Sequence, residues 1–185
     1  MNNYKEGEII GPCKTREDIA MLCETQNQNM RGIELGVARG KYSLRIHNYF
    51  DHFWCVDKWN DARHGLEEYN SLNKHIKNKN ISNITILRED FNSAVKLFED
   101  NFFNFIFLDG YAKDKKQMRH NIDTWFKKLK PGGIFSGHDF QYPGVRLVAG
   151  EFAFKNNLKL NVTGELHYTN SGRLNTDGPA WWVQT

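Results

Sequence analysis

Short apolar runs alternate with longer amphipathic stretches along most of this 185-residue chain. The most apolar run, residues 102–108, has the length of a strand and an almost continuous apolar character, which is typical of a strand buried on both faces. Strands that alternate with helices pair in parallel, because a parallel connection needs a crossover of about a dozen residues or more. The chain is therefore predicted to form an α/β fold, a doubly wound and mostly parallel sheet with helices on both faces.

The same periodicity places the individual elements. The expected strands are residues 31–36, 53–56, 83–87, 103–108, 133–136, 159–163 and 180–184. The expected helices are residues 15–30, 41–50, 62–77, 93–99, 115–129 and 145–156. Thr15 followed by Asp18 is a loose N-capping pattern for the first helix, and residues 131–133 (Pro-Gly-Gly) predict a turn before the fifth strand.

Composition limits the class of protein. Hydrophobic residues make up 39% and charged residues 25% of the chain, which is the balance of an ordinary globular protein. We expect a single domain over residues 1–185, with residues 1–30 as an N-terminal helical extension. Because no apolar stretch reaches the roughly 18 residues of a membrane span, and the N-terminus lacks the apolar core of a signal peptide, no membrane partner and a cytoplasmic location are expected.

Charge and cysteine content exclude two further kinds of site. The net charge is only +3, whereas a nucleic-acid surface needs a dense basic patch on one side, so nucleic acid is not an expected partner. Cys13, Cys23 and Cys55 show no Cys-x-x-Cys spacing and are odd in number, which argues against a disulfide framework and against a zinc site.

The unusual residues follow the predicted strands at the points where those strands end. These turns are residues 36–40, Asp57, residues 89–90, residues 109–110 and residues 137–139. In a doubly wound sheet the carboxyl ends of the parallel strands share one edge, where ligands bind in a crevice. The sequence therefore predicts one acidic, glycine-bearing crevice.

The first of these turns carries glycine at Gly36 and Gly40, which allows a tight turn and a close approach of a ligand. It departs from the dinucleotide fingerprint, because Ala38 stands where the middle glycine would be. Asp57 follows about 20 residues later, where a carboxylate accepts hydrogen bonds from ribose hydroxyls; the alternative is an N-cap for the next helix. Two cofactor classes remain open, a nicotinamide dinucleotide and an adenosyl compound.

Several short motifs are similar to those of one known family. They are residues 32–43 (GIELGVARGKYS), 107–110 (FLDG), 129–134 (LKPGGI), 136–140 (SGHDF) and 143–145 (PGV). Together they resemble class I S-adenosylmethionine-dependent methyltransferases, in particular the branch of small-molecule and sugar O-methyltransferases, some of which are metal-dependent. The resemblance runs from about Arg31 to the C-terminus. It implies a Rossmann-like, seven-stranded sheet whose C-terminal antiparallel hairpin is residues 159–163 and 180–184.

The resemblance also implies roles for particular residues. Glu34 and the Gly36 turn would contact the methionine portion of S-adenosylmethionine, and Asp57 would bind the ribose. Lys58 and Trp59 would lie beside the adenine. Asp90 would form a hydrogen bond with the adenine, and Phe91 would pack on it. The full set of expected cofactor-binding residues is Glu34, Gly36, Gly40, Tyr42, Ser43, Asp57, Lys58, Trp59, Asp90, Phe91 and Asp109.

The expected catalytic residues are Asp109, His138 and Asp139. Two carboxylates and an imidazole are also ligands for a divalent cation, Mg²⁺ or Mn²⁺, which lowers the pKa of a bound hydroxyl. In many relatives a histidine stands three residues after the fourth-strand aspartate, and here that position is Ala112. His138 is the candidate to replace it as base, since its pKa is the nearest to neutrality.

Three interpretations follow. The first is methyl transfer to a small-molecule or sugar acceptor, at oxygen. The second is a nicotinamide-dependent oxidoreductase on a similar fold, and the third a protein that binds or cleaves S-adenosylmethionine without transferring its methyl group. The short chain leaves the acceptor side of the crevice open or completed by a second subunit in a homodimer.

Overall fold

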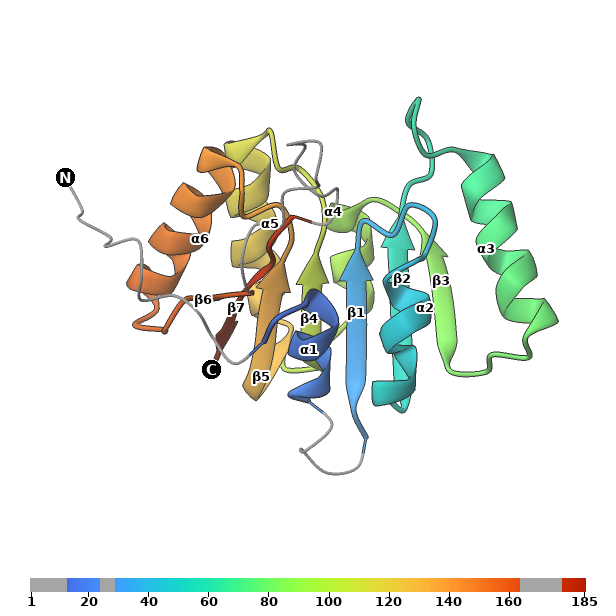
Figure 1. The fold of residues 1–185 in the computed structure, drawn as a ribbon, viewed down its shortest axis with the longest axis horizontal. Helices are drawn as coiled ribbons and strands as arrows, with labels where there is room; N and C mark the ends of the chain where they lie inside the picture. The colour runs from blue at the N-terminus through green and yellow to red at the C-terminus, as the bar shows by residue number, and fades with distance from the viewer. Residues whose placement is uncertain (1–12, 24–28, 164–177) are drawn as a thin grey trace.

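The computed structural model describes residues 13–23, 29–163 and 178–185, which form one seven-stranded sheet with helices on both faces (Figure 1). The strands are β1 (Arg31–Leu35), β2 (His52–Asp57), β3 (Ile84–Arg88), β4 (Phe103–Leu108), β5 (Leu129–Gly137), β6 (Asn161–Val162) and β7 (Trp181–Gln184). Their order across the sheet is β3-β2-β1-β4-β5-β7-β6. The predicted doubly wound, mostly parallel sheet is confirmed.

The direction of the strands explains where a ligand crevice opens. Strands β1 to β5 pair in parallel, and β7 runs antiparallel to both β5 and β6, as the predicted C-terminal hairpin requires. From β1 the chain moves outward to β2 and β3, then returns to place β4 on the other side of β1. The boundary between β1 and β4 is thus the topological switch point of the sheet, the usual position of a binding crevice in this architecture.

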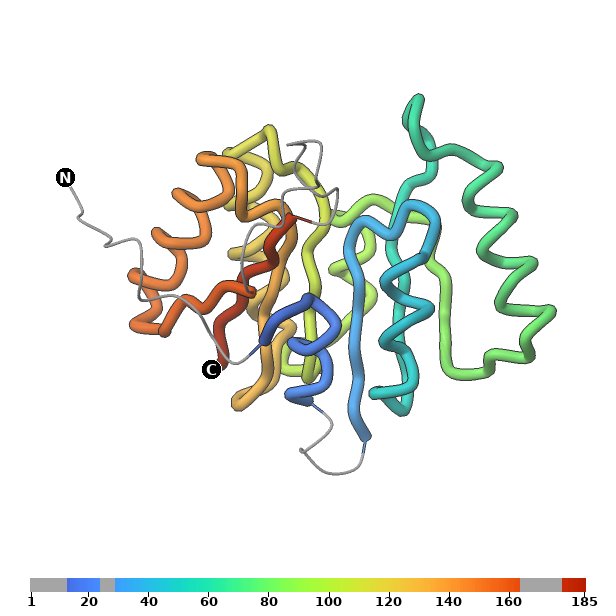
Figure 2. Tube along the Cα trace, in the orientation of Figure 1, coloured from blue at the N-terminus to red at the C-terminus, as the bar shows by residue number. Residues whose placement is uncertain are grey.

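The helices divide between the two faces. They are α1 (Arg16–Met21), α2 (Ser43–Ile46) with the 3₁₀ turn η1 (His47–Tyr49), α3 (Leu66–Asn78), α4 (Phe91–Ala94) with η2 (Val95–Leu97), α5 (Lys115–Phe126) and α6 (Pro143–Lys155). Helices α1 to α3 pack with one hydrophobic cluster and α4 to α6 with the other. The tube in Figure 2 traces this wrapping of the sheet.

Strand β4 shows why both faces are covered. Phe105 and Phe107 point into the cluster on the α1–α3 side, and Ile106 and Leu108 into the cluster on the α4–α6 side. All four side chains are buried. The strand therefore reads as a continuous apolar run, because each of its faces meets a hydrophobic core.

The first helix is shorter than the predicted residues 15–30. The expected capping pattern is present, because Thr15 accepts a hydrogen bond from the Asp18 amide while the Asp18 carboxylate accepts from the Thr15 amide. The helix ends at Met21, and Met30 already lies in extended chain beside the sheet, where its carbonyl accepts hydrogen bonds from Asp51 and His52. The rest of the expected N-terminal extension, residues 1–12 and 24–28, lies outside the described residues.

The turn predicted at residues 131–133 lies inside a strand. Helix α5 ends at Phe126, and Leu129 already pairs with Phe103, so β5 begins before the expected turn. Between Leu129 and Ile134 the register with β4 shifts, and Gly132 adopts a φ of 80°. The Pro-Gly-Gly segment therefore makes a bulge within β5, a place where glycine supplies the conformation that a strand interior lacks.

Candidate active site

A cavity of about 1060 Å³ opens at the carboxyl edge of the sheet, over the switch point. Its walls are the turns that follow β1, β2, β4 and β5, together with Phe91 of α4 and Arg16 of α1. Expected residues that line it include Glu34, Gly36, Tyr42, Asp57, Lys58, Phe91, Asp109 and Asp139. The crevice predicted from the strand ends is therefore present.

The glycine turn needs glycine for close packing as well as for its conformation. Gly36 has a φ of 94°, and a Cβ atom there would overlap the carbonyl oxygen of Asp109. Gly40 has a φ of 72°, and a Cβ atom there would lie 2.5 Å from Cδ1 of Leu72. Both positions are thus closed to other residues by backbone conformation and by space.

Asp57 shapes this turn. Its Oδ2 accepts hydrogen bonds from the amides of Val37 and Ala38, and its Oδ1 accepts one from the amide of Trp59, each at 2.9 Å. It does not cap the following helix, because α3 begins at Leu66 with Gly65 as its N-cap. The carboxylate also lines the cavity, so it joins the turn after β1 to the turn after β2.

Trp59 lies in a different place from the adenine side of the cavity where it was expected. Its side chain is 1% exposed, its ring packs on Tyr69, and its indole N–H donates to the carbonyl of Ala38 at 2.7 Å. Trp59 therefore supports the glycine turn from beneath, and the residues of this loop that line the cavity are Lys58, Asn60, Asp61, Arg63 and His64.

A buried chain of polar groups stands behind the β1 end of the cavity. Ser43 donates a hydrogen bond to the Glu34 carboxylate, and the Cys55 thiol donates to the Ser43 hydroxyl at 3.1 Å. Glu34 is 2% exposed but its carboxylate reaches the cavity wall. Burial raises the pKa of the Glu34 carboxyl to about 8, although the hydrogen bond from Ser43 acts in the opposite direction.

Asp90 and Phe91 have different roles in the structure. Asp90 is the N-cap of α4, and its carboxylate accepts hydrogen bonds from the amides of Asn92 and Ser93 and from the Ser93 hydroxyl. It borders a smaller hollow that it shares with Lys58 and Asn60, next to the main cavity. Phe91 faces the main cavity, with Tyr111 edge-on to its ring at 5.5 Å.

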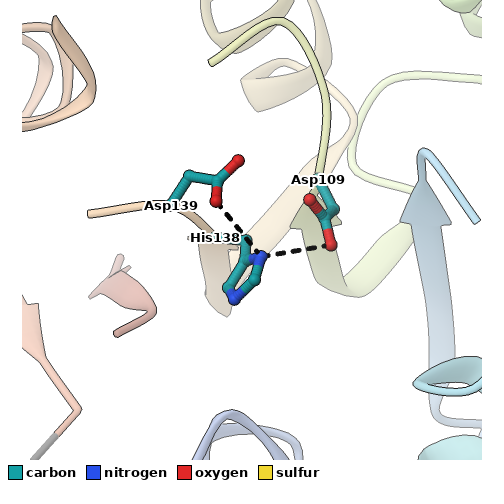
Figure 3. Close-up of side chains that lie close together, drawn as sticks. All are labelled: Asp109, His138 and Asp139. Atoms are coloured by element: carbon teal, nitrogen blue, oxygen red, sulfur yellow. Dashed lines mark ion pairs between the residues drawn. The ribbon is translucent and has the colours of Figure 1, made fainter. Parts of the chain in front are cut away.

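Asp109, His138 and Asp139 meet at the ends of β4 and β5 (Figure 3). The Nδ1 atom of His138 lies 3.4 Å from Oδ2 of Asp109 and 3.7 Å from Oδ1 of Asp139. The Nε2 atom of His138 lies 3.0 Å from the carbonyl oxygen of Gly178. Since a carbonyl only accepts, Nε2 carries a proton and Nδ1 faces the two carboxylates.

The surroundings of His138 and Asp139 shift the pKa values of these two side chains. Burial lowers the pKa of His138, but the hydrogen bond and the negative charge of Asp109 outweigh it, so the pKa is raised overall. Burial raises the pKa of Asp139, and His138 opposes that shift. Asp109 and Asp139 line the cavity, whereas His138 lies behind them with its side chain 9% exposed.

Strained backbone is concentrated at the same edge. Eight described residues other than glycine have a positive φ, and four of them are asparagines, which tolerate this conformation. The other four are Ala38, Trp59, Tyr111 and Asp139, which directly follow β1, β2, β4 and β5. Asp139 tolerates this conformation as asparagine does, whereas Ala38, Trp59 and Tyr111 cost about 1–3 kcal/mol each, and such residues cluster at functional sites.

Arg16 was not expected in the site. It is the first residue of α1, its guanidinium lies 3.8 Å from Oδ2 of Asp109, and it lines the cavity. No motif in the sequence marks it, because it lies well before the glycine turn in a segment with no fixed spacing to that turn. Only the packing of α1 on the sheet brings it to the crevice.

Comparison with known proteins decides what kind of site this is. A family model described as a methyltransferase domain matches residues 33–140, more than half of the chain. The chain belongs to this methyltransferase family. The matched range contains the glycine turn, Asp57 and the Asp109–His138–Asp139 group. No curated protein sequence matches the chain significantly.

Solved structures share the fold of this methyltransferase. Precorrin 8W decarboxylase from Methanobacterium thermoautotrophicum is 15% identical, with a TM-score of 0.66 and 98% of this chain and 95% of that chain covered. An S-adenosylmethionine-dependent O-methyltransferase from Thermotoga maritima is 16% identical, with a TM-score of 0.66 and coverages of 91% and 63%. A Streptococcus mutans protein in complex with S-adenosylhomocysteine is 13% identical, with a TM-score of 0.62 and coverages of 91% and 94%.

The sequence left two cofactor classes open, and the family decides between them. The protein is a class I S-adenosylmethionine-dependent methyltransferase with a Rossmann-like fold, as its motifs predicted. Among its described helices, none is long and apolar enough to cross a membrane. The acceptor of the methyl group is not identified by these similarities.

Proposed function

We propose that this methyltransferase transfers the methyl group to a hydroxyl oxygen of a small molecule, with Asp109, His138 and Asp139 taking up the hydroxyl proton. The observation that carries the proposal is that the Asp109 and Asp139 carboxylates lie on the cavity wall with His138 close behind both of them. Charged groups with mutually shifted pKa values in a cleft are typical of proton-transfer sites.

The reaction is a single displacement. An oxygen lone pair of the acceptor forms a bond to the methyl carbon while the carbon–sulfur bond breaks and its electron pair returns to sulfur. The products are the methyl ether, S-adenosylhomocysteine and one proton. The enzyme must hold oxygen, carbon and sulfur in line and accept that proton.

The arrangement suggests the route of the proton. Asp109 and Asp139 face the cavity, so an acceptor hydroxyl meets a carboxylate first, and His138 lies behind them as their common partner. Nδ1 of His138 lies 3.4 Å from Asp109 and 3.7 Å from Asp139, so a proton taken up by either carboxylate stays within reach of the histidine. In this arrangement His138 is a positioning residue, and the carbonyl of Gly178 fixes its ring.

The same three side chains fit a divalent cation. Two carboxylate oxygens and the unprotonated Nδ1 of a neutral His138 lie within 4.8 Å of one another, and these donor types suit Mn²⁺ or Mg²⁺. Without a proton or a cation between them, the Nδ1 lone pair would face two negative carboxylates, which is unfavourable. A bound cation would lower the pKa of the acceptor hydroxyl.

The cofactor would occupy the part of the cavity between the ends of β1, β2 and β3. We assign the methionine end to Glu34, Tyr42 and the turn from Gly36 to Gly40, with Ser43 holding Glu34 in place. Asp57 would accept hydrogen bonds from the ribose, and Lys58 and Phe91 would border the adenine. Asp90 and Trp59 would support these contacts from outside the main cavity.

The cavity volume of about 1060 Å³ lies at the upper end of typical ligand pockets, about 300–1,000 Å³. It therefore has room for a small acceptor beside the cofactor. Tyr111 and Tyr142 flank the opening, each more than a third exposed. Two aromatic side chains at the opening suit a ring-shaped acceptor, because rings stack on aromatic faces.

The test is to follow a labelled methyl group. Purified protein is incubated with methyl-labelled S-adenosylmethionine and a panel of phenols, catechols, sugars and amines, and the products are separated and identified by mass spectrometry. We expect label in a hydroxyl-bearing acceptor, and at least a tenfold loss of transfer in Asp139→Asn. A metal-free sample prepared with EDTA, then given Mn²⁺ or Mg²⁺, tests the cation.

Three outcomes would contradict the proposal or part of it. Label in an amine would exclude transfer to oxygen, and label in methylthioadenosine would show cleavage of the cofactor in place of transfer. Full activity after EDTA, with no direct binding of Mn²⁺ by calorimetry, would exclude the cation while leaving methyl transfer intact.

A further inference from the structure

Arg16 occupies the wall of the cavity nearest the ends of β1 and β4. Its side chain is 14% exposed, and its guanidinium carbon lies 4.9 Å from the centre of the Tyr42 ring. Asp109 Oδ2 lies 3.8 Å from the guanidinium. The guanidinium is therefore held by an aromatic face and by a carboxylate, and the residue lines the cavity.

The backbone that carries Arg16 is also fixed. The Tyr42 hydroxyl donates a hydrogen bond to the carbonyl oxygen of Arg16 at 3.0 Å, and Arg45 forms an ion pair with Glu17 at 2.9 Å. The capping box of Thr15 and Asp18 defines the start of α1. The contacts with Tyr42 and Arg45 thus place this arginine with respect to the segment that follows the glycine turn, although it is distant from that turn in the sequence.

Arg16 and Glu34 both line the cavity. They are close enough for the positive charge of Arg16 to act against the rise that burial causes in the pKa of the Glu34 carboxyl. A cation and a carboxyl group side by side match a ligand that carries an ammonium and a carboxylate on one carbon atom. The methionine end of S-adenosylmethionine is such a group.

We propose that Arg16 binds the α-carboxylate of the cofactor, opposite the Glu34 carboxyl group that receives its ammonium. This assignment deepens the cofactor site and rests on the proposed placement of the methionine end at β1. A guanidinium suits the task because its fork of five N–H donors can serve a ligand carboxylate in addition to the partners it already has. Two of the partners of Arg16 are the carboxylates of Asp109 and Glu17, with which it forms ion pairs at 3.8 and 4.0 Å.

The carboxylate that Arg16 binds could instead belong to the acceptor. A comparison of S-adenosylmethionine with its decarboxylated analogue distinguishes the cofactor from the acceptor as its source. Decarboxylated S-adenosylmethionine keeps the adenosine, the sulfonium and the ammonium but lacks the α-carboxylate. We expect wild-type protein to bind S-adenosylmethionine about 10 to 100 times more tightly than this analogue, as a charged hydrogen-bonded pair requires. In Arg16→Gln that ratio of dissociation constants should fall to within about threefold of one, because the carboxylate has lost its partner.

Two variants serve as controls. Arg16→Lys keeps the charge without the fork and should retain an intermediate ratio. Arg119→Gln removes an exposed arginine that pairs with Glu151 and does not line the cavity, and should leave the ratio unchanged. Calorimetry with both ligands measures each ratio, and binding of the decarboxylated analogue reports that the variant is folded.

The outcomes are decisive. A ratio that stays at its wild-type value in Arg16→Gln overturns the assignment. If the affinities for both ligands are unchanged, Arg16 binds the acceptor and not the cofactor. If both affinities fall by the same factor, the role of Arg16 is structural. Wild-type protein that binds neither ligand would overturn the cofactor placement itself, so the two failures are distinguishable.

Discussion

At the scale of single residues, the site depends on carboxyl groups that do more than their motif positions indicate. Asp57 holds the glycine turn through three backbone amides, and Glu34 lies buried with a hydrogen bond from Ser43. A buried carboxyl with a raised pKa is neutral at pH 7 in the free protein, and a bound ammonium would favour its ionised form. Cofactor binding is therefore expected to release a proton near neutral pH.

The raised pKa of Glu34 has a consequence for stability. The folded state holds the proton up to a pKa of about 8, whereas the unfolded chain releases it at its ordinary value of 4.5. The stability linked to this group is thus complete below the unfolded pKa and is lost as pH rises through the folded pKa. We expect Glu34→Gln, which cannot ionise, to gain melting temperature relative to wild type by several degrees between pH 5 and pH 8.5.

Melting curves of both proteins at several pH values measure this effect. Asp100→Asn is the matched control, because Asp100 is 61% exposed and pairs with Lys128 on the surface. It should show no comparable trend. A constant difference between Glu34→Gln and wild type across this range would contradict the prediction.

Gly36→Ala tests the close approach of the glycine turn to β4. The added methyl group meets the Asp109 carbonyl at a φ of 94°, whereas Gly132→Ala adds one at a φ of 80° with no atom within 4 Å. Gly132→Ala therefore measures backbone strain alone, about 1 kcal/mol. Gly36→Ala should cost at least about 2 kcal/mol more, as overpacking does, and should abolish S-adenosylhomocysteine binding.

Urea unfolding and calorimetry measure the two effects. Equal losses of stability in the two variants would show that the contact with Asp109 is relieved by a small backbone shift. Retained S-adenosylhomocysteine binding in Gly36→Ala would show that the turn is not part of the cofactor site.

At the scale of elements, the sequence predicted correctly the helices and strands that a single local pattern determines. The run of residues 103–108 became β4 with the expected bounds, because its short length and its aromatic side chains favour a buried strand over a buried helix. The start of β5 was missed because residues 131–133 carry a strong local turn signal, which the pairing of Leu129 with Phe103 overrides. Local signals do not reveal such long-range pairing.

The residues of the site likewise include some that a local pattern predicts and some that it does not. Asp57, Asp109 and Asp139 could be placed on the cavity from the strand ends, since parallel strands bring their carboxyl ends together. Trp59 was expected on the cavity but lies under the turn, because a positive φ of 46° turns the chain there. Arg16 was missed because its position depends on the packing of α1, which no motif encodes.

The capping box of α1 links an element to the cofactor site. Thr15→Ala should cost about 1 kcal/mol, lowering the melting temperature by about 2–4 °C. It should also weaken S-adenosylmethionine binding severalfold, because the next residue is Arg16. Asp114→Ala removes a comparable cap from α5, where Asp114 accepts from the amides of Lys116 and Gln117.

Melting curves and calorimetry on both variants separate the two effects. The α5 variant should lose similar stability and keep its affinity for S-adenosylmethionine. If both variants bind with wild-type affinity, α1 has no part in holding the cofactor.

At the scale of the whole molecule, the two faces of the sheet carry separate hydrophobic cores, and all three cysteines belong to the core under α1 to α3. Burial raises the pKa of the thiols of Cys13 and Cys23 to about 11 and 12, and raises that of Cys55 as well. The thiols are therefore unreactive in the folded state, because reagents do not reach them and because their raised pKa values keep them protonated at neutral pH.

The three thiols thus report on the opening of this core. We expect the native protein to resist N-ethylmaleimide for hours at pH 7, and to take up three equivalents in guanidinium. Saturating S-adenosylhomocysteine should slow labelling of Cys55 the most, because Cys55 donates to Ser43 behind the cofactor-facing Glu34. Mass spectrometry of peptides after timed labelling measures each site, and fast labelling of Cys55 in the free protein would refute its burial.

The four left-handed residues after β1, β2, β4 and β5 have a consequence for laboratory evolution. A library of this enzyme selected only for heat resistance would enrich glycine or asparagine at Ala38 and Tyr111, because those residues tolerate the conformation at lower cost. Each such gain would remove a side chain that faces the cavity. Heat-resistant winners from such a screen would therefore be expected to lose turnover first, so selection must score both properties together.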